Sequence, residues 1–224
     1  MKRWLVICLL LAGALIARAA EPESVLATRA QAALQAKDWP AAEGLYRELT
    51  SLAPASWTYL QGLADAQGMQ GKYADAIAGY EKAIAMALAT KEDRARWAAG
   101  VMLTAEGNSY LKLKKNADAM AAYRKAAGYA QNPATAWFNL CATAYNTGDV
   151  AAALAACDKS IAADPNKQDA YFIKASVMFG DSKTGPNGKI IPPKGTIETL
   201  RKYLELAPNG PHAKDVQEML AATQ

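Results

Sequence analysis

The chain has 224 residues, a length that suits one domain or two, and it contains a single histidine. That histidine, His212, has no obvious catalytic partner in the sequence, so Ser/His/Asp and Cys/His catalysis are excluded. A single histidine also excludes multi-histidine metal sites. The formal net charge is +4, but three basic residues lie in the first nineteen positions, and the remaining 22 face 21 acidic residues. So balanced a charge implies neither a nucleic-acid footprint nor a polyacidic partner.

The first nineteen residues have the layout of a cleavable secretory signal. Lys2 and Arg3 precede an uncharged apolar run over 4–17, and the small-residue pattern around Ala19 predicts cleavage after it. Fourteen apolar residues fall short of the ~20 that a membrane-crossing helix needs. The sequence therefore predicts a signal peptide over 1–19 and an exported protein, periplasmic or secreted, with no membrane span after cleavage.

The pattern of residues over 20–224 predicts a series of repeated helical hairpins. Apolar and small residues recur at i, i+3 and i+4, and an alanine followed four positions later by a tyrosine returns at intervals of 34 or 43 residues. The markers are Ala42–Tyr46, Ala76–Tyr80 and Ala119–Tyr123, with Ala153 in phase. The predicted hairpins span about 22–54, 55–90, 91–133, 134–167 and 168–208.

The last hairpin departs from this pattern. The stretch 180–195 has too much glycine and proline for a helix, so a loop is predicted inside the hairpin. This loop either crosses the binding groove, offers an edge to a partner, or only caps the hairpin. A final helix over about 210–222, with Val216 and Leu220 on its apolar stripe, is expected to cover the exposed end of the stack.

The hairpin at 134–167 resembles the tetratricopeptide repeat, whose pattern is W-x2-L-G-x2-Y, A-x3-F and P. The matching residues are Trp137, Leu140, Ala153 and Pro165. Cys141 stands where glycine is usual and Ala144 where tyrosine is usual. The resemblance covers about 24–208 and implies an all-α, right-handed α-solenoid of five hairpins plus a capping helix, with the first helix of each hairpin on the concave side.

Cys141 and Cys157 fall on the two helices of that hairpin. With the turn near Thr147, Cys141 is level with about Ala153, and Cys157 lies one helical turn farther on, roughly 6 Å. Added to an interaxial gap of about 8 to 10 Å, this exceeds the ~7 Å limit between bridged Cα atoms. We therefore favour two buried thiols over a disulfide.

No residue set predicts catalysis, a metal or a cofactor. The run 185–189 faintly resembles a phosphate-binding loop, but its glycine spacing fails and Ile190 follows Lys189 where Ser or Thr is required. Asp118 and Glu198 fall on solvated helix faces and form no acid and base pair. We predict a non-enzymatic protein.

The resemblance implies that a protein or peptide partner binds between the packing stripes of the first helices. The candidate contacts are Gln31, Gln35, Gln61, Asp65, Thr104, Asn108, Lys112, Phe138, Asn139, Tyr145, Phe172, Ser176 and Phe179. Asparagine and glutamine can hold a peptide backbone and aromatic rings can anchor an apolar group. For Phe138, Phe172 and Phe179, packing between hairpins or under the long loop is an equal alternative.

Some family members hold a partner's terminal carboxylate with lysine, asparagine and arginine at set first-helix positions. Here Asp169 and Ile173 stand where basic residues are needed, so an adaptor for chaperone tails is not expected. The prediction is a binding scaffold or adaptor in the cell envelope or secreted space. The alternatives are an envelope enzyme or enzyme subunit that uses the 180–195 loop, and a structural spacer in a larger complex.

Overall fold

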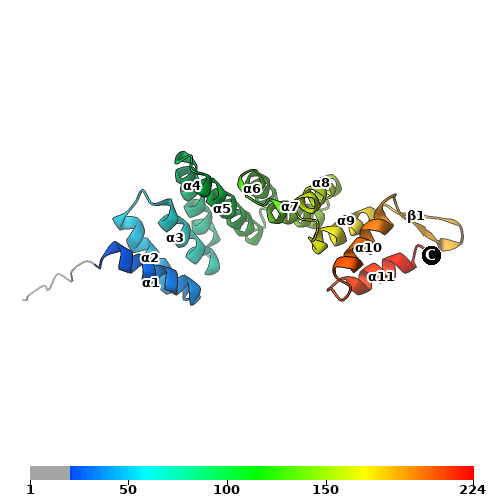
Figure 1. Ribbon diagram of the computed structural model, residues 1–224, viewed down its shortest axis with the longest axis horizontal. Helices are drawn as coiled ribbons and strands as arrows, with labels where there is room; N and C mark the ends of the chain where they lie inside the picture. The colour runs from blue at the N-terminus through cyan, green and yellow to red at the C-terminus, as the bar shows by residue number, and fades with distance from the viewer. Residues whose placement is uncertain (1–20) are drawn as a thin grey trace, which may run out of the picture.

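The computed structural model describes residues 21–224, so the predicted signal peptide at 1–19 lies outside the described part. These residues form an all-α solenoid of helical hairpins, as expected, with only two very short strands. Figure 1 shows the helices following one another along a single long axis, from blue at one end to red at the other. The helices are α1 Glu23–Gln35, α2 Trp39–Leu52, α3 Trp57–Met69, α4 Tyr73–Ala89, α5 Asp93–Lys112, α6 Asn116–Tyr129, α7 Ala134–Thr147, α8 Val150–Ala163, α9 Gln168–Gly180, α10 Thr196–Leu206 and α11 Ala213–Ala221.

The turn inside each of the first four hairpins contains one residue in the left-handed region. These residues are Lys37, Gly71, Lys114 and Gly148, and they recur at the repeat intervals of 34 and 43. Asp38 and Asp149 then cap the second helices of their hairpins, accepting hydrogen bonds from the backbone N–H of Ala41 at 3.2 Å and of Ala152 at 3.0 Å. Local turn chemistry therefore sets where each second helix begins.

The interval of 43 between the second and third hairpins exceeds the usual 34 by nine residues. These nine residues lengthen both α4 and α5. The sequence suggests a backward extension of one helix to about Lys91, but α5 begins at Asp93 and α4 runs 17 residues to Ala89, against 14 in α2. Lys91 adopts φ 60° at the junction. Trp97 lies on the extended part of α5 and is 43% exposed.

Within and between the hairpins, large side chains pack against small ones. A Cβ atom at Gly107 would lie 2.5 Å from the ring of Tyr123, and one at Gly62 would lie 2.4 Å from the ring of Tyr46. Tyr123 is completely buried. Because the glycine lacks a side chain, the helix backbone approaches the tyrosine ring directly, which is the close packing that the interior requires.

Cys141 and Cys157 are joined by a disulfide, with Cα atoms 5.1 Å apart, so the expectation of two free thiols is wrong. The error lay in the position of the turn. Gly148 is the left-handed residue and α8 begins at Val150, which centres the turn on Asp149, midway between the two cysteines in sequence. The cysteines are therefore level with one another, and the small residues around them let α7 and α8 approach closely enough for the bridge.

The predicted loop contains a small hairpin and a 3-10 turn. Strand β1, Lys183–Thr184, pairs antiparallel with β2, Ile190–Ile191, around the 3-10 turn Pro186–Gly188. The backbone N–H of Ile190 donates to the carbonyl of Ala222 at 3.2 Å, which ties the loop to the end of the chain. In Figure 1 this loop projects beyond α10 at the C-terminal end of the molecule.

A buried carboxylate fastens the first hairpin to the second. Glu43 of α2 is 6% exposed and accepts hydrogen bonds from Gln70 at 2.8 Å and from Lys72 at 2.5 Å, across the turn between α3 and α4. Arg47 adds a third bond at 2.7 Å. Lys72, with smaller contributions from Gln70 and Gln67, lowers the pKa of Glu43 to about 2 against the opposing effect of burial.

We predict that Gly107→Ala destabilises the protein and that Gly128→Ala, its control, does not. Both glycines are helical, but a Cβ at Gly128 meets nothing within 4 Å. Alanine gains about 1 kcal/mol of helix propensity at either position, whereas overpacking against the Tyr123 ring costs about 1 to 3 kcal/mol. Urea unfolding should therefore show a net loss for Gly107→Ala and a gain of up to about 1 kcal/mol for Gly128→Ala. Equal effects of the two substitutions would contradict this packing account.

We predict that Glu43 makes the protein acid-sensitive. Its folded pKa lies below the ordinary value, so its stabilisation is complete above about pH 4.5 and disappears as the pH falls toward 2. Since Lys72 and Arg47 reach solvent, where water screens the pairs, the expected contribution is about 1 to 2 kcal/mol. Urea midpoints measured between pH 6 and pH 3 should fall less steeply for Glu43→Gln than for the wild type. An unchanged slope would show that this network does not stabilise the fold.

Candidate functional site

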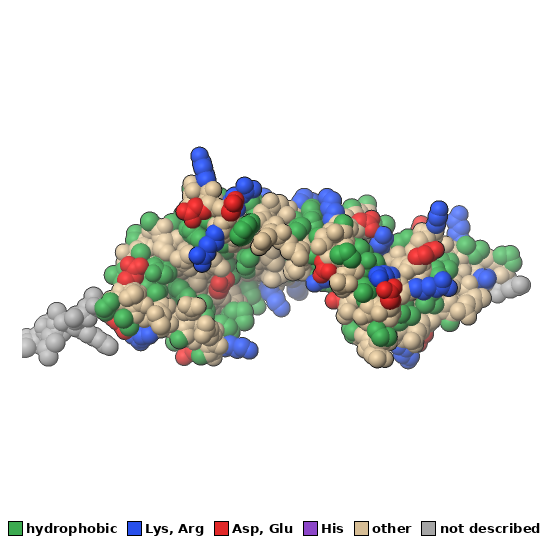
Figure 2. All heavy atoms as spheres, viewed as in Figure 1, with side chains coloured by type: hydrophobic (Ala, Val, Ile, Leu, Met, Phe, Trp, Pro, Cys, Tyr) green, Lys and Arg blue, Asp and Glu red, His purple; other side chains and the backbone are tan. Residues whose placement is uncertain are grey.

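The predicted contact residues fall in matching registers of successive first helices. Asp65 of α3, Asn108 of α5 and Ser176 of α9 are separated by the repeat intervals, 43 residues and then twice 34. One turn farther along, Lys112 and Gly180 share the next register. Figure 2 shows that the molecule is hollowed between its two ends, beneath the middle helices.

Three of the predicted residues line one cavity of about 470 Å³ between α3, α4 and α5, which we call the polar pocket. Asp65 supplies a carboxylate, Asn108 an amide and Lys112 an ammonium group. The lining residues are Asp65, Gly68, Met69, Tyr73, Tyr80, Ala105, Asn108, Ser109 and Lys112. The pocket therefore presents both hydrogen-bond donors and acceptors, which is what an extended peptide backbone requires.

Tyrosine hydroxyl groups hold the polar side chains of this pocket in place. Tyr80 donates to Asp65 Oδ1 at 2.7 Å, and Tyr123 donates to Asn108 Oδ1 at 2.7 Å. The two bonds are equivalent, since each joins a second-helix tyrosine to the first-helix residue fifteen positions before it. Side chains fixed in this way lose little freedom when a ligand binds.

Burial shifts the pKa values of the ionisable groups that form these hydrogen bonds. Burial raises the pKa of Asp65, although hydrogen bonds from Tyr80 and Gln61 oppose that shift. Burial also raises the pKa of Tyr123 to about 12, and that of Tyr80 rises for the same reason and because of the nearby Asp65. Both tyrosines therefore remain hydrogen-bond donors throughout the physiological range.

Gln61 and Thr104 contact the polar pocket less directly. Gln61 acts through its hydrogen bond to Asp65. The Thr104 hydroxyl donates to the carbonyl of Gly100 in its own helix at 3.0 Å, so its donor is already used.

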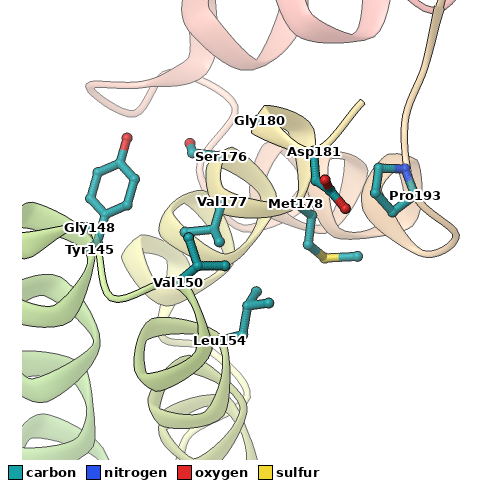
Figure 3. Close-up of a pocket in the computed structure, with 10 residues that line it drawn as sticks. All are labelled: Tyr145, Gly148, Val150, Leu154, Ser176, Val177, Met178, Gly180, Asp181 and Pro193. Carbon is teal, nitrogen blue, oxygen red and sulfur yellow. The ribbon is translucent and has the colours of Figure 1, made fainter. Parts of the chain in front are cut away.

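A second cavity, of about 760 Å³, lies between the end of α7, the start of α8 and α9, and we call it the apolar pocket. Figure 3 shows the Tyr145 ring on one side, with Val150 and Leu154 of α8 and Val177 of α9 between it and Pro193 of the loop. The lining residues are Tyr145, Gly148, Val150, Leu154, Ser176, Val177, Met178, Gly180, Asp181 and Pro193. Tyr145 and Ser176 are the predicted residues that it includes.

The two pockets occupy equivalent places in the repeat. Ser176 and Gly180 of the apolar pocket stand in the registers of Asn108 and Lys112, and Val150 begins its helix as Tyr73 does. The same register therefore carries an amide and an ammonium group between α3 and α5, but only a hydroxyl group and a glycine between α7 and α9. Aliphatic side chains, and none of the three phenylalanines, line the second pocket.

The three phenylalanines lie in the packing between elements. Phe172 stacks on His212, with ring centroids 3.8 Å apart and planes at 2°, and contacts Tyr203 at 5.8 Å. Phe138 is half-buried against the core of the fourth hairpin, with Lys167 Nζ 5.0 Å above its ring. Phe179 packs beside the core formed by α9, α10 and α11. Asn139 is half-buried, and neither it nor these rings are among the residues that line either pocket.

His212, for which the sequence showed no obvious partner, packs against the fifth hairpin. Its ring stacks on Phe172, and its backbone N–H donates a hydrogen bond to Tyr203 Oη at 3.0 Å. It therefore fastens the start of α11 to the fifth hairpin. Nδ1 lies 3.5 Å from Asp215.

The sequence missed several pocket residues because they lie on second helices and on the loop. None of Tyr73, Tyr80, Val150, Leu154 and Pro193 was among the predicted partner contacts, yet they complete the pocket walls. One signal was available for Val150, since this large aliphatic residue begins a helix and is 56% exposed. Exposed apolar side chains beside a cavity are typical of interaction sites.

Residues 21–224 contain neither a membrane-spanning helix nor a metal-binding cluster. No helix in that range is long and apolar enough to span a bilayer. Within the same range, no cluster of three or more histidine, cysteine, aspartate or glutamate side chains is placed to hold a metal ion.

The repeat pattern and the hairpin stack define an α-helical repeat protein. The chain belongs to the tetratricopeptide repeat family, whose model matches residues 27–93 and 104–167, more than half of the chain. No curated protein sequence matches the chain.

Several solved structures share the fold. YrrB, described as a tetratricopeptide repeat protein with an unusual peptide-binding site, is 19% identical with a TM-score of 0.62, covering 86% of this chain and 90% of YrrB. MamA 41-end from Desulfovibrio magneticus RS-1 is 15% identical with a TM-score of 0.63, covering 84% and 97%. A tetratricopeptide repeat protein from Parabacteroides merdae ATCC 43184 is 15% identical with a TM-score of 0.65, covering 89% and 74%. At these identities the likeness establishes the fold alone.

Proposed function

We propose that this protein is a non-enzymatic scaffold that binds an extended segment of a partner protein along its concave face. The observation that carries the proposal is the pair of pockets in one repeat register, one with Asp65, Asn108 and Lys112 between α3 and α5, the other with aliphatic side chains of α8 and α9 in its wall. The peptide-binding site named for YrrB, which shares the fold, is in keeping with it.

Each pocket suits a different part of such a segment. In the polar pocket, the Asn108 amide and the Lys112 ammonium group would donate to backbone carbonyls, while the Asp65 carboxylate would accept from a backbone N–H. In the apolar pocket, Val150, Leu154 and Val177 would surround one large aliphatic or aromatic side chain. The two pockets lie two repeats apart along the stack, so one extended segment would have to pass from the first to the second.

We further propose that the protein works in the periplasm or outside the cell. The signal-like layout of residues 1–19 supports export. The Cys141–Cys157 disulfide supports it independently, because disulfides persist in oxidising compartments and are rare in the cytosol.

The binding proposal can be tested with a displayed library of random ten-residue peptides selected on the purified protein. Synthetic copies of selected peptides would then be titrated by fluorescence anisotropy against Lys112→Ala and Val150→Asp. Each substitution removes one pocket's contact and should weaken binding about tenfold, the effect of losing about 1.4 kcal/mol. The fold should tolerate both changes, since Lys112 is exposed and an aspartate in the first turn of α8 suits the helix dipole.

Arg124→Ala is the matched control, because it removes an exposed basic residue from α6, which contributes to neither pocket. Its binding should equal that of the wild type. If all three variants bind alike with unchanged helicity, the concave face is not the binding surface. Turnover of an envelope substrate by the purified protein would instead support the enzyme alternative.

The location proposal predicts a mature chain that starts at Ala20. Expressed in a bacterial host, the protein should appear in the periplasmic or medium fraction, and intact mass spectrometry should show the loss of residues 1–19. Replacing Leu10 and Leu11 in the apolar run by arginine should hold the full-length chain in the cytosol. Retention of the wild-type chain in the cytosol with its first nineteen residues would refute export.

A further inference from the structure

The fourth hairpin is held together differently from the two before it. Gly107 and Tyr123 of the third hairpin correspond, 34 residues later, to Cys141 and Cys157. The position filled in the third hairpin by a tyrosine ring against a glycine is therefore filled in the fourth by a disulfide. Both pairs are centred in their hairpins, and Tyr123, Cys141 and Cys157 are completely buried.

The exchange of tyrosine for cysteine also reaches the concave face. Tyr80 and Tyr123 donate hydrogen bonds to Asp65 and Asn108, but a cysteine in that register offers no such hydroxyl. The first-helix residue that would need the bond in the fourth hairpin is Ala142, which has no polar side chain. The disulfide thus coincides with the loss of the hydroxyl group that holds a polar side chain on the first helix of the second and third hairpins.

We propose that the Cys141–Cys157 disulfide holds the two helices of the fourth hairpin together, in the place where Tyr123 packs against Gly107 in the third. The fourth hairpin alone would then depend on oxidation for its stability. Reduction removes no heavy atom, but the two sulfurs must separate from bonding distance to van der Waals distance between helices that are spaced for the bond. The helices α7 and α8 therefore lose the covalent link, and the fourth hairpin has no tyrosine ring to take its place. The inference does not depend on what the groove binds.

Burial of both sulfurs determines how the bond responds to a reductant. The cysteines are 0% exposed, so a reductant can attack only when α7 and α8 separate. Phosphine attack breaks the S–S bond, and water then supplies the protons of the two thiols and the oxygen of the phosphine oxide. Reduction of the native protein is therefore slow, and the bond is a structural fastening rather than a rapid sensor.

The test uses native-state hydrogen exchange on the chain with Cys8→Ser, so that only Cys141 and Cys157 are counted as thiols. After prolonged treatment with the phosphine TCEP and confirmation of two free thiols, amides in α7 and α8 should exchange about 100-fold faster, the effect expected for loss of a loop of this size. Amides in α1 and α2, three hairpins away, should change less than about threefold, because repeats interact mainly with their neighbours.

Two double variants separate the bond from the packing. Cys141→Ser with Cys157→Ser should exchange like the reduced protein whether or not TCEP is present. Cys141→Gly with Cys157→Tyr restores the pair of the third hairpin, and its α7 and α8 amides should exchange within about tenfold of the oxidised protein and be unaffected by TCEP.

Three results would overturn the proposal. One is unchanged α7 and α8 exchange in protein with two titrated thiols, and another is equal acceleration over every helix. The third is a folded glycine and tyrosine variant that exchanges as fast as the serine pair. Should that variant fail to fold, the comparison of oxidised and reduced protein decides the matter alone.

Discussion

The structure depends on the close approach of two helices at a small residue that faces a large one. In the third hairpin this is Gly107 against the buried ring of Tyr123, and between the first two hairpins it is Gly62 against Tyr46. A backbone without a side chain lets the ring fill the space between helices, which gives the interior its density. Repeating this contact along the chain produces a stack in which each hairpin packs on its neighbours.

The same tyrosines connect the core with the concave face. The rings of Tyr80 and Tyr123 lie in the core, while their hydroxyl groups hold Asp65 and Asn108 in the polar pocket. A packing residue therefore also positions a candidate binding residue. In the fourth hairpin the cysteine pair supplies the fastening without a hydroxyl, and the groove there is lined by aliphatic side chains.

Charge plays a local part in joining the hairpins. Glu43, buried on α2, gathers Gln70 and Lys72 from the turn between α3 and α4, and so fixes the first hairpin against the second. At the other end, His212 stacks on Phe172 and places α11 over the last hairpin. The two terminal units thus use specific polar and aromatic contacts beside the repeated packing motif, as expected where a repeat has a neighbour on only one side.

The sequence by itself determined the family, the hairpin pitch and the face on which a partner is expected, because alanine, tyrosine and turn residues recur at intervals of 34 and 43. It also indicated Asp65, Asn108 and Lys112, which the fold brings to one pocket. Only the tertiary structure decided the disulfide, the role of His212 and the apolar pocket. The physical reason is that these features depend on how side chains from different helices meet, and a shift of one or two residues in a turn alters which of them face each other.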